Sequence, residues 1–200
     1  IKGSTADLLS YADTQNLINE LPAAQQKLVD DIVPAQISVS GIQRVLQSLL
    51  AERISIRDLP TILEGIAEAS AFARTPQAIT EHVRTRLALQ TRAAHQSPAG
   101  YLPLLPLSPT WEQAFADALV GEGDDKHLAM APTKLQEFIA SVNTAFNAAA
   151  EQGEVPVMLV SPGIRRHIRA IIERFRPQTA ILSQAEVHPR AKLKTFGQIA

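Results

Sequence analysis

The sequence predicts an α/β protein in which an all-helical subdomain is followed by a small α/β subdomain with a mixed sheet. Three observations predict this fold class. Apolar residues in the first half recur at helical spacing, the stretch "QSPAGYLPLLPLSP" then places four prolines and one glycine together, and helical and extended patterns alternate beyond it. Residues 1–95 are therefore predicted to form the helical subdomain, 96–109 a Pro-rich linker or edge strand, and 110–200 the α/β subdomain.

Apolar stripes predict the helices of the first half. Two stripes follow the i, i+3, i+4, i+7 rule. Thr75–Pro76 opens a further helix, and a stripe near residue 30 ends at Pro34. The first regular stripe consists of Ile42, Val45, Leu46, Leu49 and Leu50, and the second of Leu59, Ile62, Leu63 and Ile66.

The joint between these two stripes, "ERISIRDLPTILEGIAE", places a short extended pattern before a helix. Asp58 is the predicted helix cap, because its carboxylate can accept hydrogen bonds from the free amides of the first turn. Pro60 then lies where its missing N–H costs nothing. Ser55 is a rival cap, but a helix starting there would carry Pro60 deeper inside.

Alternating elements follow the proline-rich stretch. Ser108–Pro109 opens a helix, "HLAMA" is a candidate strand, and Pro132 to Gln152 form a long helix. "VPVMLV" is a continuous apolar strand, Ser161–Pro162 is predicted to cap another helix, and "TAILS" and "AKLKTFGQI" supply the last strands. The predicted helix caps of the whole chain are Asp58, Thr75, Ser108 and Ser161.

The charges are distributed unevenly along a chain of net charge −1. Residues 161–200 hold eight Lys and Arg against two Asp and Glu, whereas the preceding residues hold 11 against 18. This polarity favours a protein contact surface or head-to-tail self-association. No cysteine is present, so the sequence excludes disulfides and thiolate zinc sites and fits a cytoplasmic location.

No residue pattern indicates catalysis, a metal or a cofactor. The five histidines are scattered without paired spacing, and no G-x-S-x-G, P-loop or G-x-G-x-x-G occurs. No apolar run reaches the roughly 20 residues needed to span a bilayer. Because the chain begins with Ile1, we expect a fragment whose parent contacts the membrane only through segments absent here.

The strand and helix in "VMLVSPGIRRHIRAIIERF" form the sharpest local candidate site. Arg165, Arg166 and Arg169 are predicted to stand on the outward face of the helix, whose N-terminus offers free amides. Three interpretations stay open: a solvated basic face, a contact with another protein, and a pocket for a small anion.

A winged-helix nucleic-acid-binding regulator is the alternative class. The two helices joined by a short extended piece fit its outline, but a recognition helix needs outward Arg, Lys or Asn. The second helix offers Glu64 and Glu68 instead, and carboxylates repel phosphates. We therefore expect no nucleic-acid partner.

The block "IVPAQISVSGIQRVLQSLLAERISIRDLPTILEGIAE" resembles the cytoplasmic part of the FlhA family, the export-gate proteins of flagellar type III secretion, and their injectisome relatives. "LSPTWEQAF", "LAMAPTKLQEFI", "PVMLVSPGIRRHIRAIIERFRP" and "ILSQAEVHPRAKLKTFGQI" continue the resemblance in order, from about Asp7 to Ile199. In "LSQAEVHP", many relatives have Tyr-Asn or Tyr-Gln before the Glu, and this Gln-bearing form also occurs in the flagellar branch.

The resemblance implies the last two subdomains of the tail of a bacterial inner-membrane protein that is no enzyme. Such tails form a homo-oligomeric ring, commonly ninefold, that docks export chaperone–substrate complexes and components of the export ATPase complex. Either the flagellar or the injectisome branch fits. The candidate ring or partner contacts are Arg53, Arg57, Asp58, Arg165, Arg166 and Arg169.

Overall fold

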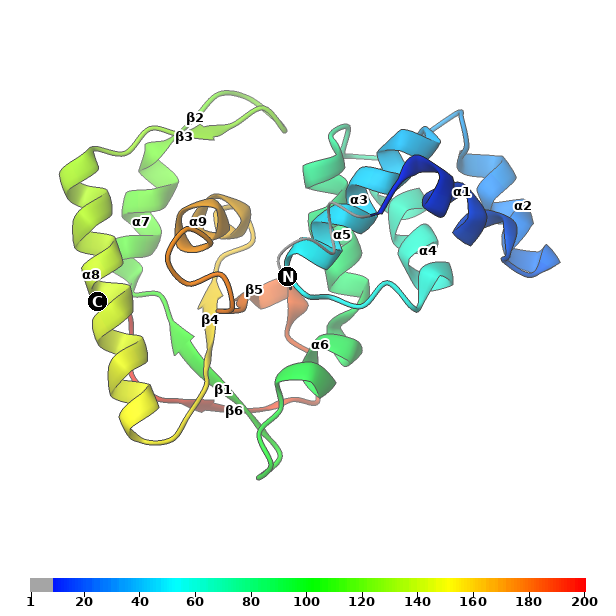
Figure 1. The fold of residues 1–200 in the computed structure, drawn as a ribbon. Helices are drawn as coiled ribbons and strands as arrows, with labels where there is room; N and C mark the ends of the chain where they lie inside the picture. Colours follow the sequence, from blue (N-terminus) through cyan, green and yellow to red (C-terminus); the bar gives the residue numbers. More distant parts are fainter. Residues whose placement is uncertain (1–8) are drawn as a thin grey trace. The chain divides into compact units, whose positions relative to one another are not determined.

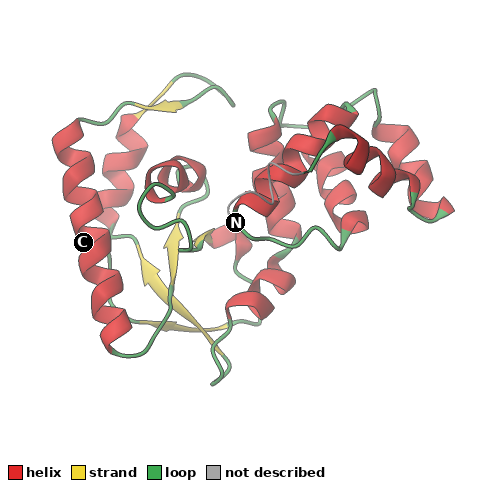
Figure 2. Cartoon of the chain, viewed as in Figure 1, coloured by secondary structure: helices red, strands yellow, loops and turns green. Residues whose placement is uncertain are grey.

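The computed structural model describes residues 9–200 and divides the chain into two compact units, one ending at Leu87 and the other running from Ala88 to Ala200. The predicted fold class is confirmed, because helices alone form the described part of the first unit and a sheet forms only in the second (Figures 1 and 2). The boundary differs from residue 95, since α6 (Ala88–His95) contacts β1 of the second unit. Residues 1–8 of the predicted helical subdomain lie outside the described residues.

The first unit is a helical bundle whose elements are α1 (Tyr11–Asn19), α2 (Ala23–Ile32), α3 (Val39–Ala51), α4 (Leu59–Ala69) and α5 (Pro76–Arg86). The predicted stripes of α3 and α4 form most of its core, together with the inward face of α5. Leu49 and Leu63 are fully buried, as helical amphipathicity requires of core positions. Gly65 lets α4 and α5 approach closely, because a Cβ there would lie 3.2 Å from the Cα of Val83.

Side-chain caps begin most of these helices. Asp58 accepts a hydrogen bond from the backbone N–H of Thr61 over 3.4 Å and another from the Thr61 hydroxyl over 2.7 Å. Thr75 caps α5 by accepting from the N–H of Ala78. Ser55 instead accepts from the N–H of Arg57, which closes a tight turn before α4. The extended residues of this joint form no strand.

The second unit contains α6, β1 (Tyr101–Pro106), α7 (Pro109–Ala118), β2 (Leu119–Val120), β3 (His127–Leu128), α8 (Pro132–Glu151), β4 (Val157–Val160), α9 (Arg165–Ile172), β5 (Ile181–Ser183), a 3₁₀ turn (Gln184–Glu186) and β6 (Lys192–Thr195). Four strands form a parallel sheet in the order β5-β4-β1-β6, and β2 and β3 form a separate antiparallel pair. Ser108 caps α7 by accepting from the N–H of Trp111.

The expected linker or edge strand at residues 96–109 is instead the buried strand β1, with β4 on one side and β6 on the other. The backbone explains why its prolines fit. The N–H of Leu107 donates to β4. Every second residue of a strand faces the same side, so the missing N–H of Pro103 also faces β4, one residue before the pairing with β4 starts at Leu104. The missing N–H of Pro106 faces β6, which has already ended at Thr195.

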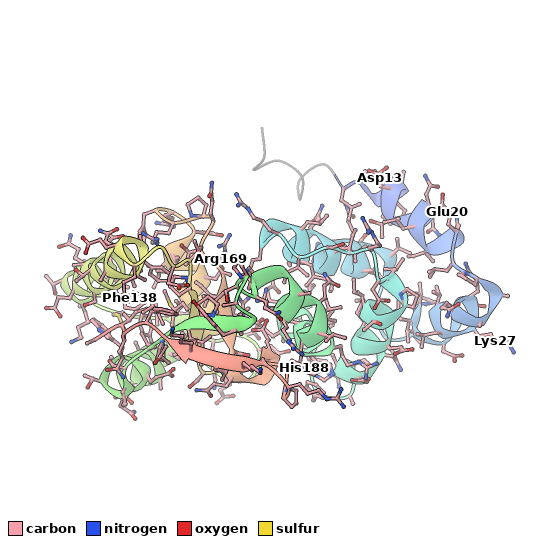
Figure 3. All side chains as sticks on the ribbon, turned by 90° about the horizontal axis from the view of Figure 1, so that it is seen from below. Asp13, Glu20, Lys27, Phe138, Arg169 and His188 are labelled. Carbon is pink, nitrogen blue, oxygen red and sulfur yellow. The ribbon has the colours of Figure 1, made fainter. Side chains whose placement is uncertain are left out.

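Both faces of the sheet are buried along β1, β4 and β5. One face packs against α7, α8 and α9, around an aromatic cluster in which the rings of Phe115 and Phe138 are 4.7 Å apart and Trp111 adjoins both. Phe138 is labelled in Figure 3. The other face buries a smaller cluster that includes Leu102, Leu104, Val157 and Leu182. Burial on both sides agrees with the continuous apolar pattern predicted for β4.

Replacing Asp58 with Ala is expected to lower the free energy of unfolding of the helical unit by about 1 kcal/mol, the typical loss for a helix cap. Urea denaturation followed by far-UV circular dichroism measures this change. Fluorescence of Trp111, the only tryptophan of the chain, reports the α/β unit and should not shift. Ser55→Ala is the matched control, and a larger loss there than in Asp58→Ala would contradict the assignment of the cap.

Candidate functional site

The described residues contain no side-chain cluster of the kind that holds a metal ion. No three His, Asp or Glu within residues 9–200 gather where they could hold a metal ion. One pocket of about 420 Å³ lies between α8 and the C-terminal segment. Ala140, Thr144, Phe196 and Gln198 are among its lining residues, and none of the residues lining it is ionisable. The residues predicted as candidate contacts lie instead on α9 and at the joint between α3 and α4.

The prediction that Arg165 stands on the outward face of α9 is wrong, because its side chain is buried and the residue is only 2% exposed. Its Nη1 donates to the carbonyl of Ile181 over 3.0 Å, and its Nε lies 3.8 Å from Oε2 of Glu186. Glu186 is equally buried and accepts from the N–H of Ser183 over 2.7 Å. A buried charge needs such partners, so Arg165 joins α9 to β5 and the 3₁₀ turn.

The other two arginines of α9 bind backbone carbonyls of the same unit. Arg166 donates to Asp124 in the loop between β2 and β3 over 3.0 Å. Arg169, labelled in Figure 3, donates to the carbonyls of Pro177 and Thr179 and lies beside Glu173. These residues hold loops against the helix, so the free basic face expected here is not formed.

Ser161 does not cap α9, which begins four residues later with Ile164 as its N-cap. Residues 161–164 form a turn in which the N–H of Ile164 donates to the Ser161 carbonyl. The N–H of Ser161 donates to Oε1 of Glu112 from α7. Burial and the charges of Arg166 and Lys126 lower the pKa of His167, so this ring adds no positive charge to α9 at neutral pH.

Replacing Arg165 with Met is expected to destabilise the α/β unit by roughly 3 kcal/mol, because Glu186 would remain buried without its cation. The urea transition of Trp111 fluorescence measures the loss. Arg174→Met is the control, since Arg174 is exposed just after α9 and should change stability by about 0.5 kcal/mol or less. Equal transitions for the two variants would contradict a structural role for Arg165.

The joint between α3 and α4 does present exposed cations. Arg53 and Arg57 are both exposed, as is Asp58. Arg53 has a φ of 63°, in the left-handed region that favours glycine. It ends α3 in a Schellman motif, in which the N–H of Arg53 binds the Leu50 carbonyl and the N–H of Ile54 binds that of Leu49. A long cationic side chain thus stands where glycine fits the backbone better.

A buried arginine supports this joint from within the first unit. Arg84 of α5 is 2% exposed, and its Nη1 lies 3.4 Å from Oε2 of Glu52, the residue before Arg53. Its Nε lies 3.8 Å from Glu81 on the same helix. The carboxylate of Glu52 therefore fixes the end of α3 to α5 and holds the Arg53 backbone in place.

Arg53→Gly is expected to stabilise the helical unit by about 1 kcal/mol, because glycine adopts a positive φ without the clash that a Cβ causes. Urea denaturation followed by far-UV circular dichroism tests this. Arg57→Gly is the matched control, since glycine in an ordinary conformation adds chain entropy to the unfolded state and should not stabilise. A loss of stability in Arg53→Gly would mean that the Arg53 side chain itself stabilises the fold.

Two surface features were missed by sequence reasoning. In the turn between α4 and α5, Phe72 is 65% exposed and its ring meets that of His82 edge-on. His82 and Arg86 of α5 bind the carboxylate of Glu68 on α4. In the second unit, Lys192 and Lys194 stand on the exposed strand β6. The spacing of Glu64, Glu68, His82 and Arg86 along two predicted helices could have indicated the first feature.

Solved structures of other proteins share this fold. The chain is similar to CdsV of Chlamydia pneumoniae, with a TM-score of 0.89 and 24% identity, covering 100% of this chain and 57% of that one. CdsV has also been solved in complex with CdsO. The nonameric EscV cytosolic domain from the type III secretion system gives a TM-score of 0.81 at 24% identity, covering 98% and 57%. The chain therefore shares its fold with CdsV and with the EscV cytosolic domain.

The family model described as the FHIPEP family matches residues 1–192, so the chain belongs to the FHIPEP family. The flagellar biosynthesis protein FlhA of Caulobacter vibrioides is 54% identical over 199 residues. FlhA of Bacillus subtilis is 28% identical over the same length. The chain spans only 28% of the length of the Caulobacter relative. Within residues 9–200, no helix is long and apolar enough to cross a membrane.

Proposed function

We propose that this chain is part of the cytoplasmic tail of a flagellar type III export gate and acts there as a non-enzymatic platform. The observation that carries the proposal is the 54% identity, along the entire chain, to a protein named for flagellar biosynthesis. The flagellar branch is favoured over the injectisome, because EscV, from the type III secretion system, is only 24% identical. The tail would belong to a bacterial inner-membrane protein whose membrane segments lie elsewhere.

In this proposal the helical unit contributes to a homo-oligomeric ring. The nonameric state of the EscV cytosolic domain, which shares this fold, supports the idea. Arg53, Arg57 and Asp58 are the proposed contacts, because they are exposed at one joint. The backbone of Arg53 is strained in a way that glycine would relieve, and strain retained at an exposed position supports a role in contact with a partner.

The proposed partners are export chaperone–substrate complexes and components of the export ATPase complex. The solved complex of CdsV with CdsO supports binding of a further protein by this fold. No metal or cofactor is needed for such a platform. Nucleic-acid binding is not favoured, because Glu64 and Glu68 line the exposed side of α4, where a recognition helix would need cations.

A chimeric protein tests the function. Replacing the matching segment of Caulobacter FlhA with this chain is expected to preserve swimming motility and the secretion of flagellar proteins into the medium. The matching segment of EscV, grafted in the same way, is the control and should not restore motility. Loss of secretion with this chain, at normal chimera levels in the membrane, would contradict the flagellar assignment.

The same chimera tests the proposed ring contact. Arg53→Glu combined with Arg57→Glu should leave the chimera folded, because exposed charges contribute little to stability. It should nevertheless weaken secretion, because the reversed charges would oppose the neighbouring subunit. Secretion equal to that of the unmodified chimera would remove this joint from the proposed interface while leaving the flagellar assignment intact.

A further inference from the structure

The two edge strands of the parallel sheet, β5 and β6, differ in whether their outward backbone groups are occupied. Along β5, the outward carbonyl of Ile181 accepts from Nη1 of Arg165, and the outward N–H of Ser183 donates to Glu186. Side chains of the same unit therefore occupy the backbone groups of that edge. This arrangement prevents a further strand from pairing with β5.

The opposite edge, β6, carries no such cover. Phe196 donates its N–H to Leu104 of β1, so alternation turns the N–H and carbonyl groups of Leu193 and Thr195 away from the sheet. Within residues 9–200, no hydrogen bond occupies these groups. All four residues of β6 are exposed, and Figure 3 shows the strand lying beside β1. The edge is free to pair with another extended backbone.

The side chains of β6 carry positive charge. Lys192 and Lys194 share one face of the strand, and Arg190 precedes them at the same spacing. No carboxylate of the described residues lies within salt-bridge distance of any of the three. The Nζ atom of Lys194 lies 5.0 Å from the ring centre of Tyr101 and 5.2 Å from that of Phe196, which keeps this cation beside the edge. Leu193, 51% exposed, offers an apolar neighbour on the other face.

We propose that β6 binds an extended acidic segment of another protein as a fifth strand of the sheet. Backbone hydrogen bonds to Leu193 and Thr195 would hold the segment, and carboxylates at every second residue would face Lys192 and Lys194. A second copy of β6 is a poor occupant, because antiparallel or parallel pairing would bring lysines against lysines. The proposal concerns an interaction surface of the α/β unit and does not depend on the proposed export role.

Edge lysines also protect proteins from unwanted strand pairing, so the test must separate protection from recognition. The probe is a capped ten-residue peptide of alternating Glu and Val with a fluorescent label, titrated with the complete 200-residue chain and followed by fluorescence anisotropy. Saturable binding that weakens with added salt is expected. Hydrogen exchange should show new protection at the amides of Leu193 and Thr195.

A backbone variant tests strand addition directly. Thr195→Pro removes an outward N–H without removing any bond to β1, so the fold should persist while peptide affinity falls by about tenfold or more. Thr195→Val keeps the N–H and is the matched control, with affinity unchanged. Lys192→Glu with Lys194→Glu should also abolish binding. Trp111 fluorescence confirms that each variant is folded.

Two results would overturn the proposal. The first is equal binding of a peptide N-methylated at every amide, which keeps its carboxylates but has no N–H on either edge to pair as a strand. The interaction would then be electrostatic alone. The second is the absence of binding by the parent peptide even at low salt. In that case the lysines of β6 only protect the edge from pairing.

Discussion

The α/β unit depends on β1 being a central strand despite its two prolines. Each proline lies at a position where its missing N–H would face a neighbour that has not begun or has already ended, so the ladder loses no hydrogen bond. β4 can then pair on one side and β6 on the other, and the helices pack on the face that includes Leu105 and Met158. Moving either proline by one residue would place the missing donor inside a ladder. The register of β1 thus determines which strand of the sheet is left with a free edge.

Local chemistry made much of the fold predictable. The caps Asp58, Thr75 and Ser108 depend on side chains three residues from the amides that they bind, and the stripes of α3 and α4 depend on helical periodicity. Ser161 has the same local pattern, yet its N–H is bound by Glu112, 49 residues away, and the helix starts later. Tertiary contacts of this kind have no signal in one sequence. The short pair β2 and β3 was also only half predicted, because two-residue strands carry almost no periodicity.

The arginines show the main limit of sequence reasoning about the candidate sites. Arg84 and Arg165 lie in polar-looking helices, and their charge alone suggests exposure. Both are buried because a carboxylate from a distant segment meets each of them, Glu52 in one unit and Glu186 in the other. Arg53 and Arg57, equally charged, are exposed. The difference lies in the fold around each residue. The excess of positive charge in the last forty residues therefore did not indicate which of those cations are exposed, whereas the position of β6 at the edge of the sheet does.

A free sheet edge that is repeated around a ring of subunits would bind a partner with several acidic segments through many weak contacts. Pairing along the few residues of β6 supplies only a small number of hydrogen bonds, each of which contributes about 1 kcal/mol net, so one edge binds one acidic segment weakly. In the proposed ring every copy of the chain presents the same edge. A partner with several acidic segments would then bind through a high effective concentration, and it would still release each segment quickly. Weak, repeated and salt-sensitive contacts suit a platform that must hold its partners briefly and then pass them on.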